Sequence, residues 1–279
     1  MPALNERRRT VRTEGAELAV FEYGLRPAPG VATLLLVHGY PDDHRLYLPL
    51  ITELAATHHV IAYDTRNAGV SSVTEAPGNF TLDALVDDVF AVLAFMDVSD
   101  VHLVGHDWGS IQGWAAVQDP RAAGLIARYT SISGPDLGHF ISWLRSRARN
   151  PRRWPQLAGQ LLRSSYVAGF QVPVLPETIW RLVLTRLYER SAGRRVNDDP
   201  VRGLALYRQN LFPRVRRPSP AQVSVPVNVV VPLKDPFLSP RLTDGLELWV
   251  ADLNVVRADG GHWWPATHPK ELAHLLRAL

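Results

Sequence analysis

The sequence has no cysteine among its 279 residues. This absence excludes disulfides, thiol nucleophiles and cysteine-based metal sites. The sequence also lacks an apolar run long enough to span a bilayer. The segment MPALNERRRT carries charges with no apolar stretch behind them, so we expect no signal peptide. These absences favour a soluble, cytoplasmic protein that does not insert into membranes.

Lysine is scarce, because Lys234 and Lys270 are the only lysines and every other basic residue is arginine. The formal net charge is only +3. Nucleic-acid binders concentrate basic residues beside base-stacking aromatics, and only residues 145–163 approach that pattern. A solvated, arginine-rich outer face explains this stretch better. We therefore expect no nucleic-acid partner.

Short, continuous apolar runs recur in the first part of the chain. Thr33–Val37, His59–Tyr63 and Val101–Val104 are each typical of a strand covered on both faces. A helical apolar pattern after Thr81, a candidate N-cap, lies between the second and third runs. Strands that alternate with helices through short loops predict an α/β fold with a parallel sheet and right-handed crossovers.

The alternation stops near residue 137, and residues 137–220 show proline-punctuated helical pieces without a strong strand. One helix is predicted from Pro176 to about Gly193, and another from about Asp199 to Leu211. The first of these has three apolar residues on one stripe, namely Ile179, Val183 and Leu187.

Strands return at Pro226–Val231 and Leu253–Val256. We therefore expect residues 1–136 and 221–279 to form the core, and residues 137–220 to form a helical cap. Such a cap is expected to cover the carboxyl edge of the sheet, where open α/β sheets bind their ligands.

The strongest motif is Gly105-His106-Asp107-Trp108-Gly109, directly after a predicted strand and before the predicted helix Ser110–Gln118. Its spacing is that of a nucleophile elbow, in which small flanking residues let a strained turn lift one side chain above the sheet. Here that side chain is Asp107, which is already an anion at neutral pH. A carboxylate suits attack on a strained sp³ carbon, which forms an alkyl ester on the enzyme.

Two further residues are candidates for the other members of a catalytic triad. Asp235 follows the strand Pro226–Val231, and His262 follows the last strand, so the order is nucleophile, acid, histidine. His262 is predicted to be the base, and Asp235 is predicted to orient its imidazole. Asp259 and Asp136 are weaker rivals for the acid. Asp259 is too near His262 in sequence to reach round it easily.

The segment His38-Gly39-Tyr40-Pro41 follows the strand Thr33–Val37. The loop at this position supplies one oxyanion-hole amide in α/β-hydrolases, and the residue after the nucleophile supplies the other. We assign these backbone N–H groups to Tyr40 and Trp108. Their side chains are also expected to contact substrate.

With these motifs together, the sequence resembles the soluble-type epoxide hydrolases of the α/β-hydrolase superfamily over the whole chain. The resemblance implies the α/β-hydrolase fold, with a mostly parallel eight-stranded sheet flanked by helices and a helical cap inserted after the sixth strand. It also implies two cap tyrosines that hydrogen-bond the epoxide oxygen. The contexts Tyr166-x-x-x-Phe-Gln and Tyr207-Arg-x-Asn match those of the family, and Tyr188 is the fallback.

One motif departs from the family pattern Asp-x-Arg-Gly-x-Gly-x-Ser, because Asn67 replaces its first glycine. Asparagine tolerates left-handed backbone dihedrals, so the loop is expected to keep its shape. The chain also resembles the hydrolase half of proteins that carry a following short-chain dehydrogenase domain, and we expect no such domain here.

The predicted reaction converts a small apolar epoxide and water into a vicinal diol, without a cofactor or metal. His102 and His106 are four residues apart but lie across a strand end, so a shared metal is not expected. A haloalkane dehalogenase with the same Asp107 nucleophile is the alternative function. A non-catalytic binding protein on a hydrolase scaffold is a more remote one. The sequence leaves a monomer and a homodimer equally open.

Overall fold

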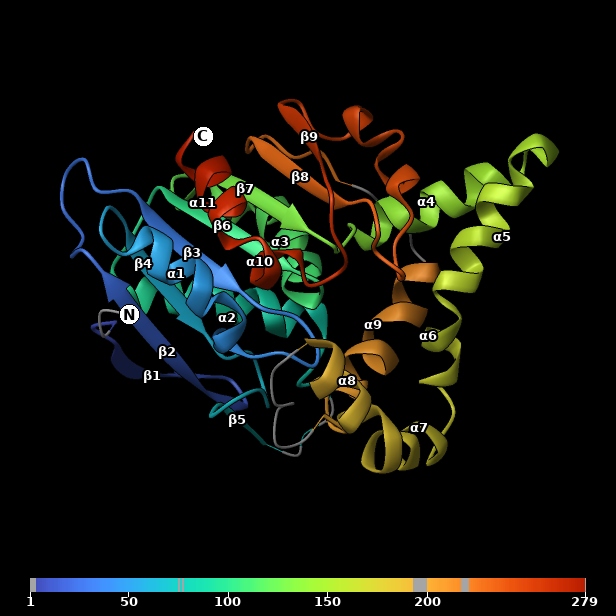
Figure 1. The fold of residues 1–279 in the computed structure, drawn as a ribbon, viewed down its shortest axis with the longest axis horizontal. Coiled ribbons are helices and arrows are strands. Elements are labelled where there is room, and N and C mark those ends of the chain that lie inside the picture. Colours follow the sequence, from blue (N-terminus) through green and yellow to red (C-terminus); the bar gives the residue numbers. More distant parts are fainter. Residues whose placement is uncertain (1–3, 75, 77, 193–199, 217–220, 279) are drawn as a thin grey trace.

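The computed structural model describes residues 4–74, 76, 78–192, 200–216 and 221–278. A twisted sheet fills the left-hand part of the molecule as seen in Figure 1. Its strand order is β1-β2-β4-β3-β6-β7-β8-β9, and the short strand β5 pairs with β2. The strands are β1 (Arg7–Thr13), β2 (Ala16–Gly24), β3 (Thr33–Val37), β4 (His59–Tyr63), β5 (Ser72–Val73), β6 (Val101–His106), β7 (Ile126–Ile132), β8 (Val227–Pro232) and β9 (Leu253–Ala258).

The sheet is mostly parallel, as expected. β2 pairs antiparallel with β1, β4 and β5, and the pairs from β4 through β3, β6, β7 and β8 to β9 are parallel. Eight strands form the continuous path, and the two-residue β5 is an addition that the sequence did not suggest.

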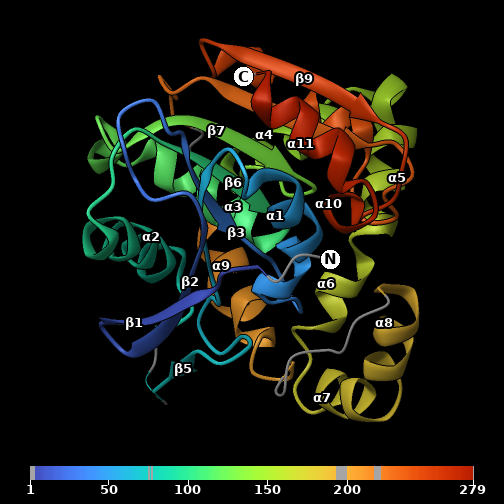
Figure 2. The ribbon, with the colours of Figure 1, turned by 60° about the vertical axis from the view of Figure 1, so that its left-hand side comes forward.

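Helices cover both faces of the sheet (Figure 2). Alternate residues of β3 point to opposite faces, since the side-chain period of a strand is two. Leu34 and Leu36 share a buried cluster with α1 (Leu48–Leu54), α10 (Trp264–Thr267) and α11 (Pro269–Arg277). Leu35 and Val37 share another with α2 (Leu82–Met96) and α3 (Trp108–Gln118). Burial on both sides explains why β3 reads as a continuous apolar run.

The described residues between β7 and β8 form mainly helices. These helices lie together beyond the carboxyl ends of β3, β6 and β7 (Figure 1). They are α4 (Leu137–Ala148), α5 (Trp154–Arg163), α6 (Ser165–Gly169), α7 (Leu175–Ile179), α8 (Thr185–Ala192) and α9 (Leu204–Arg216). β7 is the sixth strand of the continuous path in chain order, so the predicted place of the insertion is confirmed. None of the described helices could cross a membrane.

The helix expected from Pro176 differs from the prediction, because a π-helical turn at Trp180–Leu184 separates α7 from α8. The predicted apolar stripe is largely exposed, with Val183 at 55% and Leu187 at 57%. A helical period shows which residues share a face and leaves open whether another element covers it. The expected helix limits near Gly193 and Asp199 lie outside the described residues.

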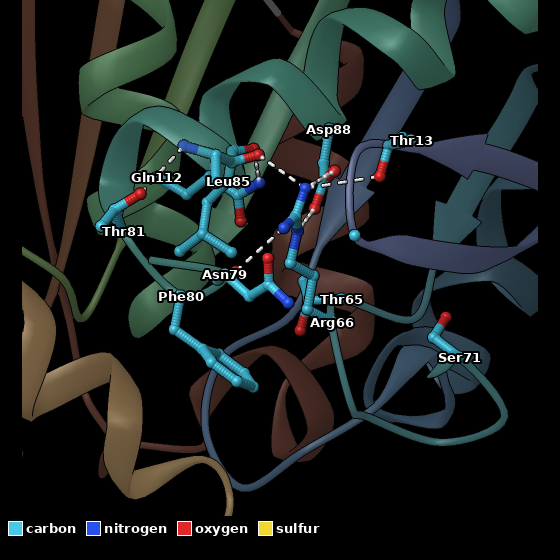
Figure 3. Close-up of polar contacts among 12 residues, drawn as sticks. Thr13, Thr65, Arg66, Ser71, Asn79, Phe80, Thr81, Leu85, Asp88 and Gln112 are labelled. Carbon is cyan, nitrogen blue, oxygen red and sulfur yellow. Dashed lines mark hydrogen bonds and ion pairs between the residues drawn. The ribbon is translucent and has the colours of Figure 1, made fainter. Parts of the chain in front are cut away.

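A buried ion pair fixes the loop after β4 to α2 (Figure 3). The Arg66 guanidinium donates to both carboxylate oxygens of Asp88, at 2.6 and 2.8 Å, and also to the backbone oxygen of Asn79. The two charged side chains are 2% and 1% exposed. Burial raises the pKa of Asp88, and the hydrogen bonds and charge of Arg66 oppose that rise.

The same loop supports the segment that carries Tyr40. Asn67 has a φ of 61°, which confirms the expected left-handed residue in place of glycine. The backbone N–H of Thr65 donates to Nε2 of His38 at 3.0 Å, and Nδ1 of His38 donates to the backbone oxygen of Gly39 at 2.8 Å. The loop after β4 therefore braces the loop after β3.

Candidate active site

Asp107 sits on a sharp turn between β6 and α3, with φ 52° and ψ −120°. The turn brings β6, α3 and β3 into close contact. A Cβ atom on Gly105 would collide with the backbone of Gly109, and one on Gly109 would collide with the backbone oxygen of Val37. Glycine at both positions is therefore a steric requirement of the turn that presents Asp107.

The carboxylate of Asp107 lies among backbone donors. The N–H of Tyr40 donates to Oδ1 at 2.8 Å, and the N–H of Trp108 also hydrogen-bonds the carboxylate. Burial raises the pKa of Asp107 to about 6, although the charge of His262 and the two N–H groups hold it down. The side chain is 15% exposed, so one part of this mostly desolvated carboxylate remains accessible.

His262 connects Asp107 with Asp235. Nδ1 of His262 lies 2.9 Å from Oδ2 of Asp235, and Nε2 lies 3.6 Å from Oδ2 of Asp107. The second oxygen of Asp235 accepts the backbone N–H groups of Phe237 at 2.8 Å and Leu238 at 3.2 Å. Both oxygens of Asp235 are thus engaged, and its orientation toward His262 is fixed.

The charges of this cluster stabilise one another. Burial would lower the pKa of His262, but the charge and hydrogen bond of Asp235, with the charges of Asp107 and Asp42, outweigh burial and raise it. Burial would raise the pKa of Asp235, but the charge and hydrogen bond of His262 and the Phe237 N–H bring it below its usual value. Asp235 is therefore a carboxylate at neutral pH.

The two rival acids lie elsewhere. Asp259 is 78% exposed and pairs with Lys234 at 2.7 Å. Asp136 caps α4, where it accepts the backbone N–H of His139 at 2.6 Å, and its other oxygen accepts from Gln118 at 3.0 Å. Among the three aspartates considered, the structure brings only Asp235 into contact with the ring of His262.

Tyr166 on α6 and Tyr207 on α9 face the carboxylate from the helical side. Their ring centroids are 6.0 Å apart, and the ring of Tyr207 lies 5.1 Å from that of Trp108 in an edge-on arrangement. Burial raises the pKa of both phenols, and the charge of Asp107 raises each further. Both side chains therefore keep their O–H protons at neutral and moderately alkaline pH.

Two cavities meet at these groups. The first has a volume of about 480 Å³ and the second about 440 Å³, within the range of small-molecule sites. Five residues line both cavities, namely Asp107, Tyr166, Tyr207, Phe237 and His262. The predicted nucleophile, base and phenols thus lie at the junction of the two cavities, and Asp235 contacts the far side of the His262 ring.

Sequence reasoning missed several neighbours of this cluster. Asp42 is buried and accepts hydrogen bonds from Tyr188 and from Nε1 of Trp263, the latter at 3.1 Å. The fallback residue Tyr188 therefore directs its hydroxyl toward Asp42. The ring of Phe237 packs edge-on against His262 at 4.9 Å. A carboxylate two residues after Tyr40 was the only signal available for Asp42, and Phe237 had none.

One group of described residues has metal-ligand geometry, since potential ligand atoms of Asp43, His44 and Asp64 lie within 4.8 Å of one another. Hydrogen bonds within the protein already engage this group. Nδ1 of His44 lies 2.7 Å from Oδ1 of Asp64, and the carboxylate of Asp43 accepts a hydrogen bond from Nε of Arg45. These bonds give the three residues a structural role in holding the loops after β3 and β4.

The sequence matches the family described as the alpha/beta hydrolase fold over residues 32–269, and the chain belongs to this family. A relative from Mycobacterium tuberculosis, named probable oxidoreductase EphD, is 32% identical over 98% of this chain. The chain spans about half the length of that relative, at 49%. Epoxide hydrolase 3 of Mus musculus is 23% identical over 96% of this chain and 75% of its own length.

A solved structure has the same fold. The epoxide hydrolase of Bacillus megaterium, crystallised with an inhibitor, superposes with a TM-score of 0.78 at 22% sequence identity. The alignment covers 97% of this chain and 99% of that one. This likeness extends across the sheet and the helices between β7 and β8, and it supports a shared architecture.

Proposed function

We propose that the protein is an epoxide hydrolase that uses Asp107 as a nucleophile and forms a covalent alkyl ester. The observation that carries the proposal is the meeting of Asp107, His262 and two cap phenols where two cavities join. The names of the mouse and Bacillus proteins support the same reaction. Residues 1–136 and 221–279 then act as the core, and residues 137–220 act as the cap.

In the first step, Oδ2 of Asp107 attacks one ring carbon, and the bond between that carbon and the ring oxygen breaks. Oδ1 stays with the N–H of Tyr40, so Oδ2 is the oxygen left for attack. Tyr166 and Tyr207 donate to the ring oxygen, and one phenol transfers its proton as the alkoxide forms. Opening the strained ring is the driving force that a weak carboxylate nucleophile needs.

In the second step, Nε2 of His262 takes a proton from water, and the hydroxide attacks the ester carbon of Asp107. The N–H groups of Tyr40 and Trp108 stabilise the resulting oxyanion, and one such donor is typically worth about 3–4 kcal/mol. The protonated His262 returns its proton to the departing diol oxygen. The remaining water proton restores the phenol, and one water oxygen stays on Asp107.

The alternative dehalogenase reaction would use the same carboxylate and release a halide ion. A free halide gains from N–H donors, and the indole of Trp108 is one such group in the first cavity. Two phenols beside the carboxylate are instead suited to an oxygen leaving group that must gain a proton. The cavity chemistry therefore favours an epoxide, a class of small apolar substrate.

The test incubates the purified protein with epoxides and with bromoalkanes of the same carbon skeleton, and measures the diol and the bromide that form. Diol formation that is lost in Asp107→Asn and unchanged in the exposed variant Asp259→Asn supports the proposal. Bromide release without diol formation would assign the dehalogenase reaction. Absence of both products, with the protein folded, would leave the remote option of a non-catalytic binding protein.

A further inference from the structure

The two cavities share a junction of five residues and are otherwise lined by different residues. The first chamber is the cavity of about 480 Å³ and the second chamber is the cavity of about 440 Å³, and both include Asp107 and the two cap phenols. An epoxide whose oxygen reaches Tyr166 and Tyr207 therefore lies where both chambers begin.

The two chambers have different walls of similar chemistry. The first chamber lies between α3, α4, α5 and α6, and its apolar wall includes Ile111, Leu137, Ile141, Leu144, Leu161 and Val167. The second chamber lies under α8 and the π-helical turn, and its wall includes Pro41, Phe170, Trp180, Leu184, Leu187 and Trp263.

Charge is confined to the junction. Apart from Asp107 and His262, none of the described residues that line either chamber has a charged side chain. A charged substituent placed in either chamber would lose its hydration without gaining an opposite charge, which is unfavourable. An uncharged hydrocarbon substituent would instead be removed from water against apolar side chains, which is favourable.

Each chamber also reaches the surface of the cap. Leu161 lines the first chamber and is 52% exposed, whereas Leu187 lines the second and is 57% exposed. A substituent can therefore extend along either chamber toward the surface. Neither chamber ends as a closed pocket that would admit only a hydrogen atom or a methyl group.

We propose that the preferred substrates are internal epoxides that carry an uncharged apolar substituent on each ring carbon, one for each chamber. This inference rests on the proposed function. A terminal epoxide has a single substituent, so it fills one chamber and leaves the apolar wall of the other in contact with water. An internal epoxide desolvates both walls and is held from two sides against Asp107.

The experiment compares two epoxides of one linear ten-carbon chain, with the ring at the end or in the middle. Leu144→Trp narrows the first chamber, and Leu184→Trp narrows the second. The two variants are matched, because both replace a partly exposed leucine with tryptophan. Leu182→Trp is the matched control, because Leu182 is 66% exposed and lines neither chamber.

The wild-type protein should have the higher kcat/KM for the internal epoxide. Each chamber variant should lower the ratio of internal to terminal kcat/KM by about tenfold or more, because one misfitting group in an apolar pocket costs roughly 10–200-fold. The control should keep the wild-type ratio. Turnover of the terminal epoxide shows that a chamber variant is folded.

A ratio that stays at the wild-type value in Leu184→Trp or in Leu144→Trp would overturn the inference, because one chamber would then hold no substituent. A wild-type preference for the terminal epoxide would also overturn it, while the proposed function would stand. If the folded wild-type protein opens neither epoxide, the proposed function itself fails, so the two failures are distinguishable.

Discussion

Nε2 of His262 lies 3.6 Å from Oδ2 of Asp107, which is too long for a hydrogen bond. Nδ1 of His262 is engaged by Asp235 at 2.9 Å, so the neutral ring carries its proton there and Nε2 is the acceptor. The proposed nucleophile is therefore close to the proposed base without being hydrogen-bonded to it. A water molecule that approaches the ester carbon of Asp107 can donate to Nε2.

The pH dependence of ester formation follows from the pKa of Asp107, which burial raises to about 6. Only the ionised carboxylate attacks carbon. We predict that kcat/KM falls by roughly tenfold per pH unit below about pH 6. We also predict that kcat/KM does not fall near pH 10, because burial raises the pKa of both phenols and keeps them protonated. A steady-state pH profile with one epoxide measures this. An acid limb near pH 4 would contradict it.

Stability should depend on Asp107 in the opposite direction from activity. Its pKa is about 6 in the folded protein and close to 3.9 in an unfolded chain. The folded state therefore binds more protons between these pH values, and stability is lost as the pH rises through them. We predict that Asp107→Asn abolishes turnover and stabilises the fold at pH 7 by up to about 3 kcal/mol.

Thermal or urea unfolding of the purified variant tests this stabilisation. Asp259→Asn serves as the control, because Asp259 is exposed and its ion pair with Lys234 lies at the surface. An Asp107→Asn protein that is less stable than the wild type at pH 7 would show that the charge is well solvated in the resting site.

The two cap phenols are predicted to act on ester formation. Tyr166→Phe and Tyr207→Phe should each slow that step by about 10²-fold, because each removes one donor to the developing oxyanion. The double variant should lose nearly all ester formation. Stopped-flow measurement of a single turnover separates this step from hydrolysis. Tyr23→Phe is the control for the loss of a buried hydroxyl, because the Tyr23 hydroxyl donates a hydrogen bond to Glu6 and Tyr23 lines neither cavity.

The buried pair Arg66–Asp88 is predicted to matter for stability. Arg66→Ala leaves the buried carboxylate of Asp88 on α2 without its ion-pair partner, and we expect a loss of about 3–5 kcal/mol in the free energy of unfolding. Replacing both residues with apolar side chains, as in Arg66→Met with Asp88→Leu, should restore much of it. Urea unfolding measures both. The exposed pair Arg12–Glu17 is the control, and Arg12→Ala should cost less than about 1 kcal/mol.

The sequence predicted that Asp107, His262 and Asp235 would meet, because each residue occupies a short motif directly after a strand. Parallel strands end at one edge of a sheet, so residues far apart in sequence must meet there. The same reasoning predicted Asn67 in the left-handed region, where its φ is 61°. These features depend on local backbone conformation and on strand direction, and short sequence motifs predict both.

The packing of the cap could not be predicted in the same way. The apolar period after Pro176 indicated one helix, but a π-helical turn divides it and Leu187 is mostly exposed. The contacts of Asp42 with Tyr188 and Trp263 join three distant segments. No single stretch of sequence specifies such contacts, because they depend on how the helices pack against the sheet in the folded protein.

The most direct test of the central claim is a single turnover in heavy-oxygen water, followed by mass spectrometry of the peptide that contains Asp107. The account predicts that one heavy oxygen enters Asp107 of the wild-type protein, and that His262→Gln instead accumulates the alkyl ester. Diol carrying the heavy oxygen directly from water, with Asp107 unlabelled and no ester in His262→Gln, would contradict a covalent intermediate.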